Sequence, residues 1–227
     1  PVVVLTGVGR DEEPLTQRMA DGEMAYNHRT GWLTENAWPP HLGVMATRAM
    51  PVLLARHPPV EGSEGLCYGR QEMELRAGWE AQAAGLLTFA KGAGCSVIYT
   101  SPSARCLSVA RRLEAQTGWP LRLDDRLLEL NFGQWEGLSW NVVPRVALDS
   151  WAEDPEGFSP PKGESGRALQ ERVQSFWADL VHAGEAALVI SHGGPLRLLD
   201  GLAKGERANL LAPSMPQGSS RLHYVSV

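Results

Sequence analysis

Short apolar runs alternate with helical patterns from residue 50 to the end of this 227-residue chain. Runs typical of buried strands occupy residues 52–55, 97–100, 121–123, 186–190 and 222–227. Helical patterns occupy residues 79–90, 101–117, 165–182 and 195–203. Buried strands that alternate with helices form parallel sheets whose two faces are both covered. The sequence therefore predicts an α/β fold with three layers, α/β/α, around a mostly parallel central sheet.

Two helix starts carry local signals. Ser165 is typical of an N-cap, because its side chain can accept a hydrogen bond from the first turn. The helix at residues 101–117 is expected to have Pro102 or Ser103 in its first turn, where proline is tolerated. It would then begin directly after the strand at residues 97–100.

The first 49 residues have a different character. Residues 11–40 are polar, with scattered Met and Trp and no sustained helical or strand period. We interpret residues 1–49 as an N-terminal extension, either partly disordered or upstream of a natural start at Met50. Residues 50–227 then form the domain. An ordered arm packed on that domain is the alternative interpretation.

Composition limits the classes of function. Lys and Arg total 21 against 26 Asp and Glu, and this net charge of −5 argues against nucleic-acid binding. The longest aliphatic stretch, residues 186–190, is far shorter than the roughly 20 residues that span a bilayer. No basic region followed by an apolar one stands at residues 1–30, so we do not expect secretion. The three cysteines lack disulfide-scaffold or zinc-site spacing. We expect a cytoplasmic protein without membrane contact, and its oligomeric state stays open.

Charged and titratable residues stand where the predicted elements end. Arg56 and His57 follow the first strand, and His192 follows the strand at residues 186–190. Because ligands bind at the carboxyl ends of parallel strands, we expect these residues to face a ligand together with Arg105 and Glu129. Arginines match phosphate oxygens, a neutral imidazole can attack phosphorus, and a carboxyl group can protonate the leaving oxygen. The set favours phosphoryl transfer that needs no metal and no cofactor.

Four segments, taken together, resemble the motifs of one family. They are Leu53–His57 (LLARH), Ser101–Arg105 (SPSAR), Glu129–Gly137 (ELNFGQWEG) and Ser191–Gly194 (SHGG). In this order they resemble the histidine phosphatase (phosphoglycerate mutase-like) superfamily over about residues 50–227. Residues 65–70, 135–137 and 159–165 are most similar to its α-ribazole phosphatase branch in cobalamin synthesis. The resemblance implies a phosphoglycerate mutase-like fold and hydrolysis of a small phosphomonoester, with α-ribazole 5′-phosphate as first choice.

The resemblance also assigns roles to residues. His57 would become phosphohistidine, Arg56 and Arg105 would grip the phosphoryl oxygens, His192 would stabilise their charge, and Glu129 would serve as acid and then base. The remaining carried-over positions are the substrate contacts Tyr68, Gly69 and Arg70 and the helix-start residue Gly193, whose N–H would face an anion. Metal and cofactor are absent from this scheme.

Pro58 is a departure from the family pattern, because relatives have glycine there and proline has no N–H to donate to phosphate. Glu136 is a rival to Glu129 as proton donor, but it lies in a glycine-rich turn, and we prefer Glu129. Two alternative functions stay open. One is a broad-specificity sugar-phosphate or nucleotide phosphatase, and the other is a non-catalytic module that binds a phosphate ligand.

Overall fold

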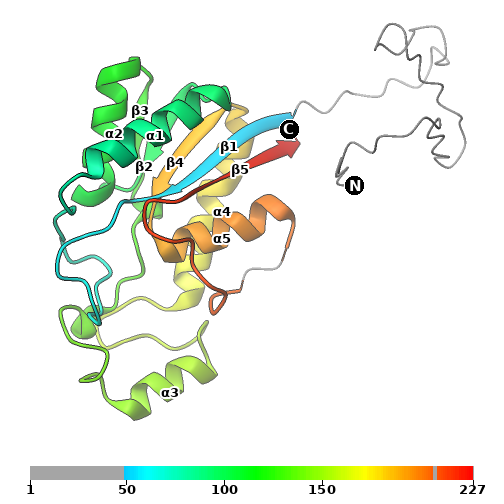
Figure 1. The fold of residues 1–227 in the computed structure, drawn as a ribbon. Helices are drawn as coiled ribbons and strands as arrows, with labels where there is room; N and C mark the ends of the chain where they lie inside the picture. The colour runs from blue at the N-terminus through cyan, green and yellow to red at the C-terminus, as the bar shows by residue number, and fades with distance from the viewer. Residues whose placement is uncertain (1–48, 207–208, 227) are drawn as a thin grey trace, which may run out of the picture. The chain divides into compact units, whose positions relative to one another are not determined.

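The computed structural model describes residues 49–206 and 209–226 (Figure 1). The strands are β1 (Ala49–Arg56), β2 (Val97–Thr100), β3 (Leu121–Leu123), β4 (Ala187–Ser191) and β5 (Ser220–Ser226). The helices are α1 (Trp79–Gly92), α2 (Ala104–Thr117), α3 (Arg145–Glu153), α4 (Gly166–Ala183) and α5 (Gly193–Lys204), with short 3₁₀ turns η2 (Asp125–Leu127) and η3 (Gly133–Trp135). Every strand and helix predicted from residue 50 onward is present; β2 and β3 have the predicted ends, and the other elements have shifted ends. The predicted extension, apart from Ala49, lies outside the described residues.

The described strands form one sheet in the order β3-β2-β4-β1-β5. β1 pairs in parallel with β4, β4 with β2, and β2 with β3, whereas β5 runs antiparallel to β1. Leu188 of β4 lies between Leu53 of β1 and Ile98 of β2. The predicted mostly parallel sheet is confirmed, and the carboxyl ends of β1, β4 and β2 meet at one edge.

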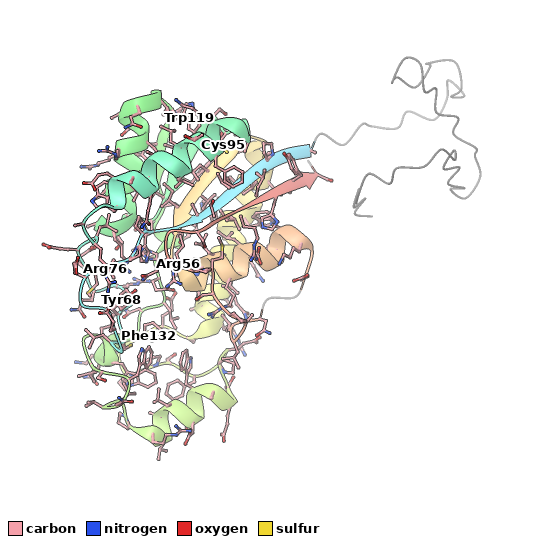
Figure 2. All side chains as sticks on the ribbon, in the orientation of Figure 1. Arg56, Tyr68, Arg76, Cys95, Trp119 and Phe132 are labelled. Atoms are coloured by element: carbon pink, nitrogen blue, oxygen red, sulfur yellow. The ribbon has the colours of Figure 1, made fainter. Side chains whose placement is uncertain are left out.

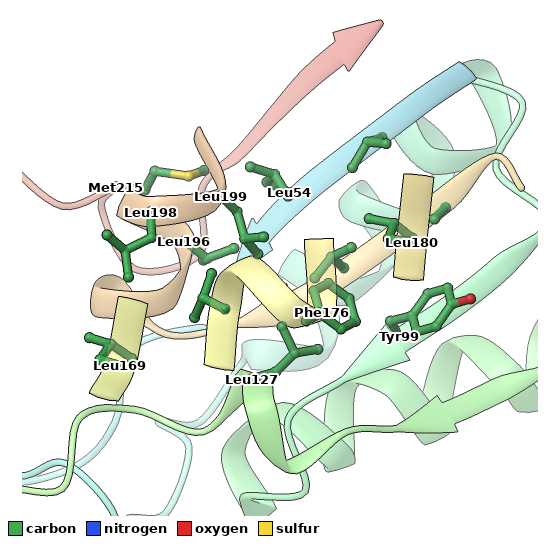
Figure 3. Packing of buried hydrophobic residues seen from close by; sticks show 14 of the residues in the cluster. Leu54, Tyr99, Leu127, Leu169, Phe176, Leu180, Leu196, Leu198, Leu199 and Met215 are labelled. Carbon is green, nitrogen blue, oxygen red and sulfur yellow. The ribbon is translucent and has the colours of Figure 1, made fainter. Parts of the chain in front are cut away.

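Alternate side chains of each strand face opposite layers. Leu54 and Val189 belong to a core with α4 and α5, whose packing Figure 3 shows. Leu53 and Ile190 belong to a second core with α1 and α2. A fully buried side chain of this size contributes about 1.5–3 kcal/mol relative to an exposed one. The two cores confirm the three-layer α/β/α architecture and make the sheet a rigid support for its carboxyl edge.

Helix boundaries correct part of the expectation. Ser165 caps α4 as predicted, since its Oγ accepts a hydrogen bond from the N–H of Ala168 at 3.2 Å. The second helix begins at Ala104 and not at Ser101, because the N–H of Ser101 extends the sheet by donating to Ile190 at 3.0 Å. α3 was not predicted, although its half-buried Ala147, Leu148 and Trp151 form a short apolar stripe at helical spacing that packs on a small core. No helix in the described ranges has the length and apolar character to cross a membrane.

Candidate active site

Two buried histidines follow neighbouring strands at the carboxyl edge of the sheet. His57 follows β1, and His192 lies between β4 and α5. Because β1 and β4 pair in parallel, the two rings meet edge to face with their centroids 5.2 Å apart. Each side chain is only 1% exposed. In Figure 2, Arg56 lies at this end of β1, whereas Cys95 lies toward the opposite end of the strands.

The hydrogen bond of His57 decides which ring nitrogen is free. Nδ1 lies 2.8 Å from the carbonyl oxygen of Pro58. A carbonyl oxygen only accepts, so Nδ1 carries the proton and Nε2 of the neutral ring keeps its lone pair. Burial lowers the pKa of His57 from 6.5 to about 3; the Pro58 hydrogen bond opposes this shift, and the charges of Arg105 and Arg56 add to it. Pro58, although it lacks an N–H, thus helps to present Nε2 as a nucleophile.

His192 is held in the opposite tautomer. A guanidinium only donates, and Nε of Arg105 lies 3.2 Å from Nδ1 of His192. Nε2 of His192 therefore carries the proton and donates to Oγ of Ser101 at 2.8 Å. Burial, followed by the charge of Arg105, lowers the pKa of His192 well below its usual value. His192 is consequently a neutral N–H donor beside His57.

Arg105 is a fully buried arginine at the start of α2. Its Nη1 donates to the carbonyl of Gln71 at 2.9 Å and its Nη2 to the carbonyl of Gly69 at 2.5 Å. The guanidinium also lies over the ring of Tyr68, 5.5 Å from its centroid. Neutral carbonyls do not cancel the positive charge, so Arg105 keeps an anion-attracting charge beside the two histidines. Tyr68 and Gly69 thereby help to place this arginine.

The predicted substrate contacts on the loop at residues 68–70 have separate partners. The hydroxyl of Tyr68 accepts a hydrogen bond from Gln217 at 2.6 Å. A Cβ on Gly69 would lie 2.0 Å from the carbonyl oxygen of Leu130, so close backbone packing requires glycine there. Arg70 forms an ion pair with Glu164 at 3.5 Å. The structure therefore brings Tyr68 to the site through Arg105 and turns Arg70 toward Glu164.

Arg56 lies against the amino terminus of α5. Its Nη1 donates to the carbonyl of Met215 at 2.6 Å and to the hydroxyl of Ser214 at 3.2 Å. A Cβ on Gly193 would lie 3.2 Å from the guanidinium carbon, so glycine permits this close approach. The guanidinium and the positive end of the helix dipole both favour an anion here.

The carboxylate of Glu129 lies against the first turn of α5. The N–H of Gly194 donates to both carboxylate oxygens, at 3.1 and 3.2 Å, and the N–H of Leu130 donates to Oε1 at 2.9 Å. A Cβ on Gly194 would lie 2.3 Å from Oε1, so this contact also depends on glycine. The helix-start N–H that reaches this carboxylate is that of Gly194, and the role of Gly193 toward a substrate anion stays a prediction.

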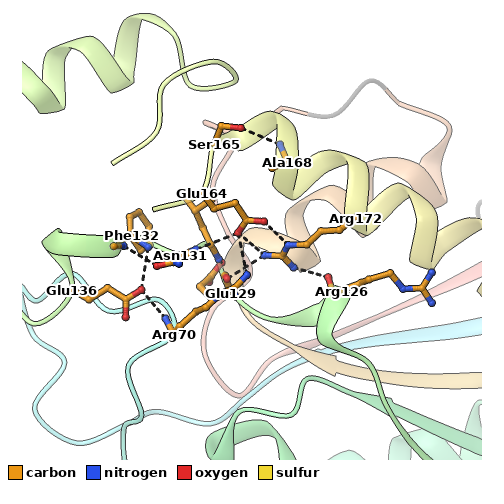
Figure 4. Close-up of polar contacts among 12 residues, drawn as sticks. Arg70, Arg126, Glu129, Asn131, Phe132, Glu136, Glu164, Ser165, Ala168 and Arg172 are labelled. Atoms are coloured by element: carbon orange, nitrogen blue, oxygen red, sulfur yellow. Dashed lines mark hydrogen bonds and ion pairs between the residues drawn. The ribbon is translucent and has the colours of Figure 1, made fainter. Parts of the chain in front are cut away.

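Glu136 is engaged in joining two loops (Figure 4). Its carboxylate accepts hydrogen bonds from the backbone N–H groups of Arg70 at 3.0 Å, Gln71 at 2.6 Å and Phe132 at 3.0 Å. A carboxylate with three backbone donors has a structural role that accounts for it. Glu129 also accepts backbone hydrogen bonds, but it lines a cleft together with Arg56, and Glu136 does not. The geometry therefore favours Glu129 over Glu136 as the candidate proton donor.

Arg172 of α4 fixes the segment that carries Glu129. Its Nη2 donates to the carbonyl of Glu129 at 3.1 Å, and its Nη1 donates to the carbonyl of Arg126 at 2.6 Å. Its Nε pairs with Glu164 at 2.7 Å, and both side chains of this pair are largely buried. Figure 4 shows these contacts converging on Arg172.

A cleft lies next to these groups and has an aromatic wall. Phe132, Trp140 and Trp151 line it and contact one another; the rings of Trp140 and Trp151 are 6.2 Å apart and nearly parallel. Trp135 does not line the cleft, because it is buried in a small core with Cys67. The polar residues that line the cleft are Arg56, Glu129, Gly193, Gly194, Arg197 and Ser214.

Sequence reasoning missed four members of this region. Ser101 directly follows a strand, so its contact with His192 could have been anticipated. Gly194 and Arg197 share the first turns of α5, and residues three apart lie on one helix face, which was an available signal. Trp151 also had a signal, since Ala147, Leu148 and Trp151 stand at helical spacing, although α3 was not predicted.

The low pKa of His57 predicts a loss of stability in acid. The unfolded chain takes up a proton on this histidine near pH 6.5, whereas the folded protein does so only near pH 3. The unfolded state therefore binds more protons between these values, and the free energy of unfolding falls as pH drops through this window. Between about pH 7.5 and about pH 4.5, the free energy of unfolding should fall in both proteins, and we expect the fall to be about 2–3 kcal/mol smaller in His57→Asn than in the wild type. Denaturant unfolding measures the difference, and identical pH dependence in both proteins would contradict it.

Comparisons with known proteins agree with this geometry. The family model described as histidine phosphatase superfamily (branch 1) matches residues 52–220. The Escherichia coli K12 adenosylcobalamin/alpha-ribazole phosphatase is 28% identical over 66% of this chain and 77% of its own length. Phosphoserine phosphatase 1 of Hydrogenobacter thermophilus is 27% identical over 65% of this chain and 73% of its own length. The crystal structure of the alpha-ribazole phosphatase from Shigella flexneri superimposes with a TM-score of 0.68 at 26% identity, covering 76% of this chain and 89% of that one.

The sheet, its two covering layers and its histidine-bearing edge define a phosphoglycerate mutase-like α/β protein. The chain belongs to the histidine phosphatase superfamily, branch 1. It is accordingly a phosphoric monoester hydrolase, as its phosphatase relatives are named.

Proposed function

We propose that this phosphatase works without a metal, through a phosphohistidine at His57, and that α-ribazole 5′-phosphate is its substrate. The observation that carries the mechanism is the His57 tautomer: Nδ1–H is bonded to the Pro58 carbonyl and Nε2 is free in a neutral ring. Arg56 and Arg105 supply the positive charge for the phosphoryl oxygens. His192 supplies a neutral N–H, which would exchange its Ser101 acceptor for a phosphoryl oxygen.

The reaction proceeds in two balanced steps. Nε2 of His57 attacks phosphorus, the ester P–O bond breaks, and its electron pair goes to the leaving oxygen, which takes a proton from Glu129. Water then attacks the phosphohistidine and gives a proton to the Glu129 carboxylate, while the P–N bond breaks and its electrons return to His57. Glu129 must therefore be protonated in the first step and ionised in the second.

Support for α-ribazole 5′-phosphate comes from the cleft and from named relatives. Its leaving group carries a benzimidazole ring, and the wall of Phe132, Trp140 and Trp151 offers a surface on which a flat ring packs. Alpha-ribazole phosphatases are among the similar proteins. A sugar phosphate needs no such wall, whereas the flat base of a nucleotide can also pack on it. A cytoplasmic location and the absence of nucleic-acid partners stay predictions from the sequence.

A matched pair of substrates tests this choice. Ribose 5-phosphate has the same phosphorylated carbon as α-ribazole 5′-phosphate but lacks the ring. We expect kcat/KM to be about tenfold higher for α-ribazole 5′-phosphate, the order of one or two aromatic contacts. Trp140→Leu should reduce only that value, whereas Trp119→Leu, outside the cleft lining, should change neither. Equal kcat/KM for the two substrates in the wild type would remove the α-ribazole assignment.

A further inference from the structure

Arg197 lines the same cleft and is not used by the proposed mechanism. It follows Gly193 and Gly194 by about one turn of α5, so it lies on the side of the helix that faces the cleft. Its Nη1 donates to the carbonyl of Leu210. Within the described residues, the Nε atoms of Arg56 and Arg197 are the buried side-chain nitrogens and oxygens without a hydrogen-bond partner.

The charge of Arg197 is poorly compensated in the free protein. No ion pair joins it to a carboxylate in residues 49–206 or 209–226. Burial lowers the pKa of Arg197, and the charge of Arg56 acts in the same direction against the raising effect of Glu129. Buried charges in proteins are normally paired, because an unpaired one loses its hydration without compensation. A negatively charged group of a bound ligand at this point of the cleft would form an ion pair with Arg197.

We propose that Arg197 is a binding site for a second anionic group, a carboxylate or a phosphate, on the leaving alcohol of the substrate. Arg56, at the phosphoryl end, would hold the phosphate that is hydrolysed, and Arg197 would select the molecule that carries it. The inference rests on the proposed phosphatase activity but not on α-ribazole 5′-phosphate, whose leaving group is uncharged. A strong preference at Arg197 would rank acidic phosphomonoesters above that substrate.

Two matched substrate pairs isolate the second anion and its source. O-Phosphoserine differs from phosphoethanolamine by one carboxylate, and adenosine 3′,5′-bisphosphate differs from adenosine 5′-phosphate by one phosphate. A charge-assisted hydrogen bond is worth about 1.5–3 kcal/mol, so kcat/KM should favour the more acidic member of at least one pair by about tenfold or more. The pair that shows the preference identifies carboxylate or phosphate as the group bound.

Arg197→Met keeps the apolar stem and removes the charge. It should bring the ratio of kcat/KM for the more acidic member to kcat/KM for the less acidic member close to one. The value for the less acidic member should stay within about threefold of the wild type. Arg197→Lys should restore part of the preference, and Arg111→Met, an exposed arginine of α2, should not alter it. If Arg197 only tethers the segment at Leu210, both members of a pair will lose activity equally, which overturns the proposal.

Turnover is not the sole readout of this site. His57→Ala protein can be titrated calorimetrically with both members of each pair, so the preference is measurable even if no substrate is hydrolysed. Absence of turnover with a retained preference in binding would refute the proposed catalysis and support the second-anion site. Equal affinities within both pairs, or equal kcat/KM values in the wild type, would refute the second-anion site alone.

Discussion

Replacing His57 with alanine is expected to abolish turnover of phosphomonoesters, with kcat lower by at least about four orders of magnitude. The physical reason is that no other group can form the P–N bond: His192 has its Nδ1 lone pair engaged by Arg105 and a proton on Nε2. Brief incubation of the wild type with a labelled phosphomonoester should give an acid-labile, base-stable adduct, and rapid quench with gel analysis should detect none in His57→Ala.

The matched control for this prediction is His182→Ala, which removes an exposed histidine near the end of α4. It should retain both the adduct and the turnover of the wild type. An adduct that persists in His57→Ala would move the nucleophile to another residue. If the wild type showed neither adduct nor turnover across a panel of phosphomonoesters, the alternative of a non-catalytic phosphate-binding module would hold instead.

Most of the fold was predictable because a strand that is buried on both faces has a continuous apolar sequence. The runs at residues 52–55 and 186–190 are apolar throughout, as strands covered by helices must be, and both proved to be central strands. Strand order has no such signal in the local sequence, because the position of β4 between β1 and β2 depends on long-range pairing. α3 was missed because its apolar stripe of Ala147, Leu148 and Trp151 spans only about one turn and packs on a small core that contains no strand residue.

The candidate site was predictable where residues sit at strand ends and unpredictable where they depend on distant backbone. His57 and His192 could be placed together because parallel strands end at one edge. The burial of Arg105 could not be anticipated, because carbonyls of the loop at residues 69–71 accept its hydrogen bonds. The same holds for Pro58, whose lost N–H was visible in the sequence, whereas the use of its carbonyl was not.

Glu129→Gln is expected to reduce kcat/KM for alkyl phosphates such as ribose 5-phosphate by about 10²–10⁴-fold, the usual contribution of general acid catalysis. An amide of the same shape can keep one acceptor for the N–H of Gly194 but cannot give a proton to the leaving oxygen. p-Nitrophenyl phosphate has a leaving group that needs little protonation, so its first step should be nearly normal. Its second step still lacks a base, and stopped-flow absorbance should therefore show a stoichiometric burst of nitrophenolate followed by slow turnover.

Glu136→Gln is the matched control because it makes the same chemical change in the rival carboxylate. Glu136 accepts three backbone hydrogen bonds, so the amide should lower the free energy of unfolding by about 1–3 kcal/mol. Any loss of activity should then be equal for ribose 5-phosphate and p-nitrophenyl phosphate, with no burst. If Glu136→Gln produced the burst and the leaving-group dependence instead, the acid–base role would pass to Glu136, and Glu129 would be only a partner of the α5 amino terminus.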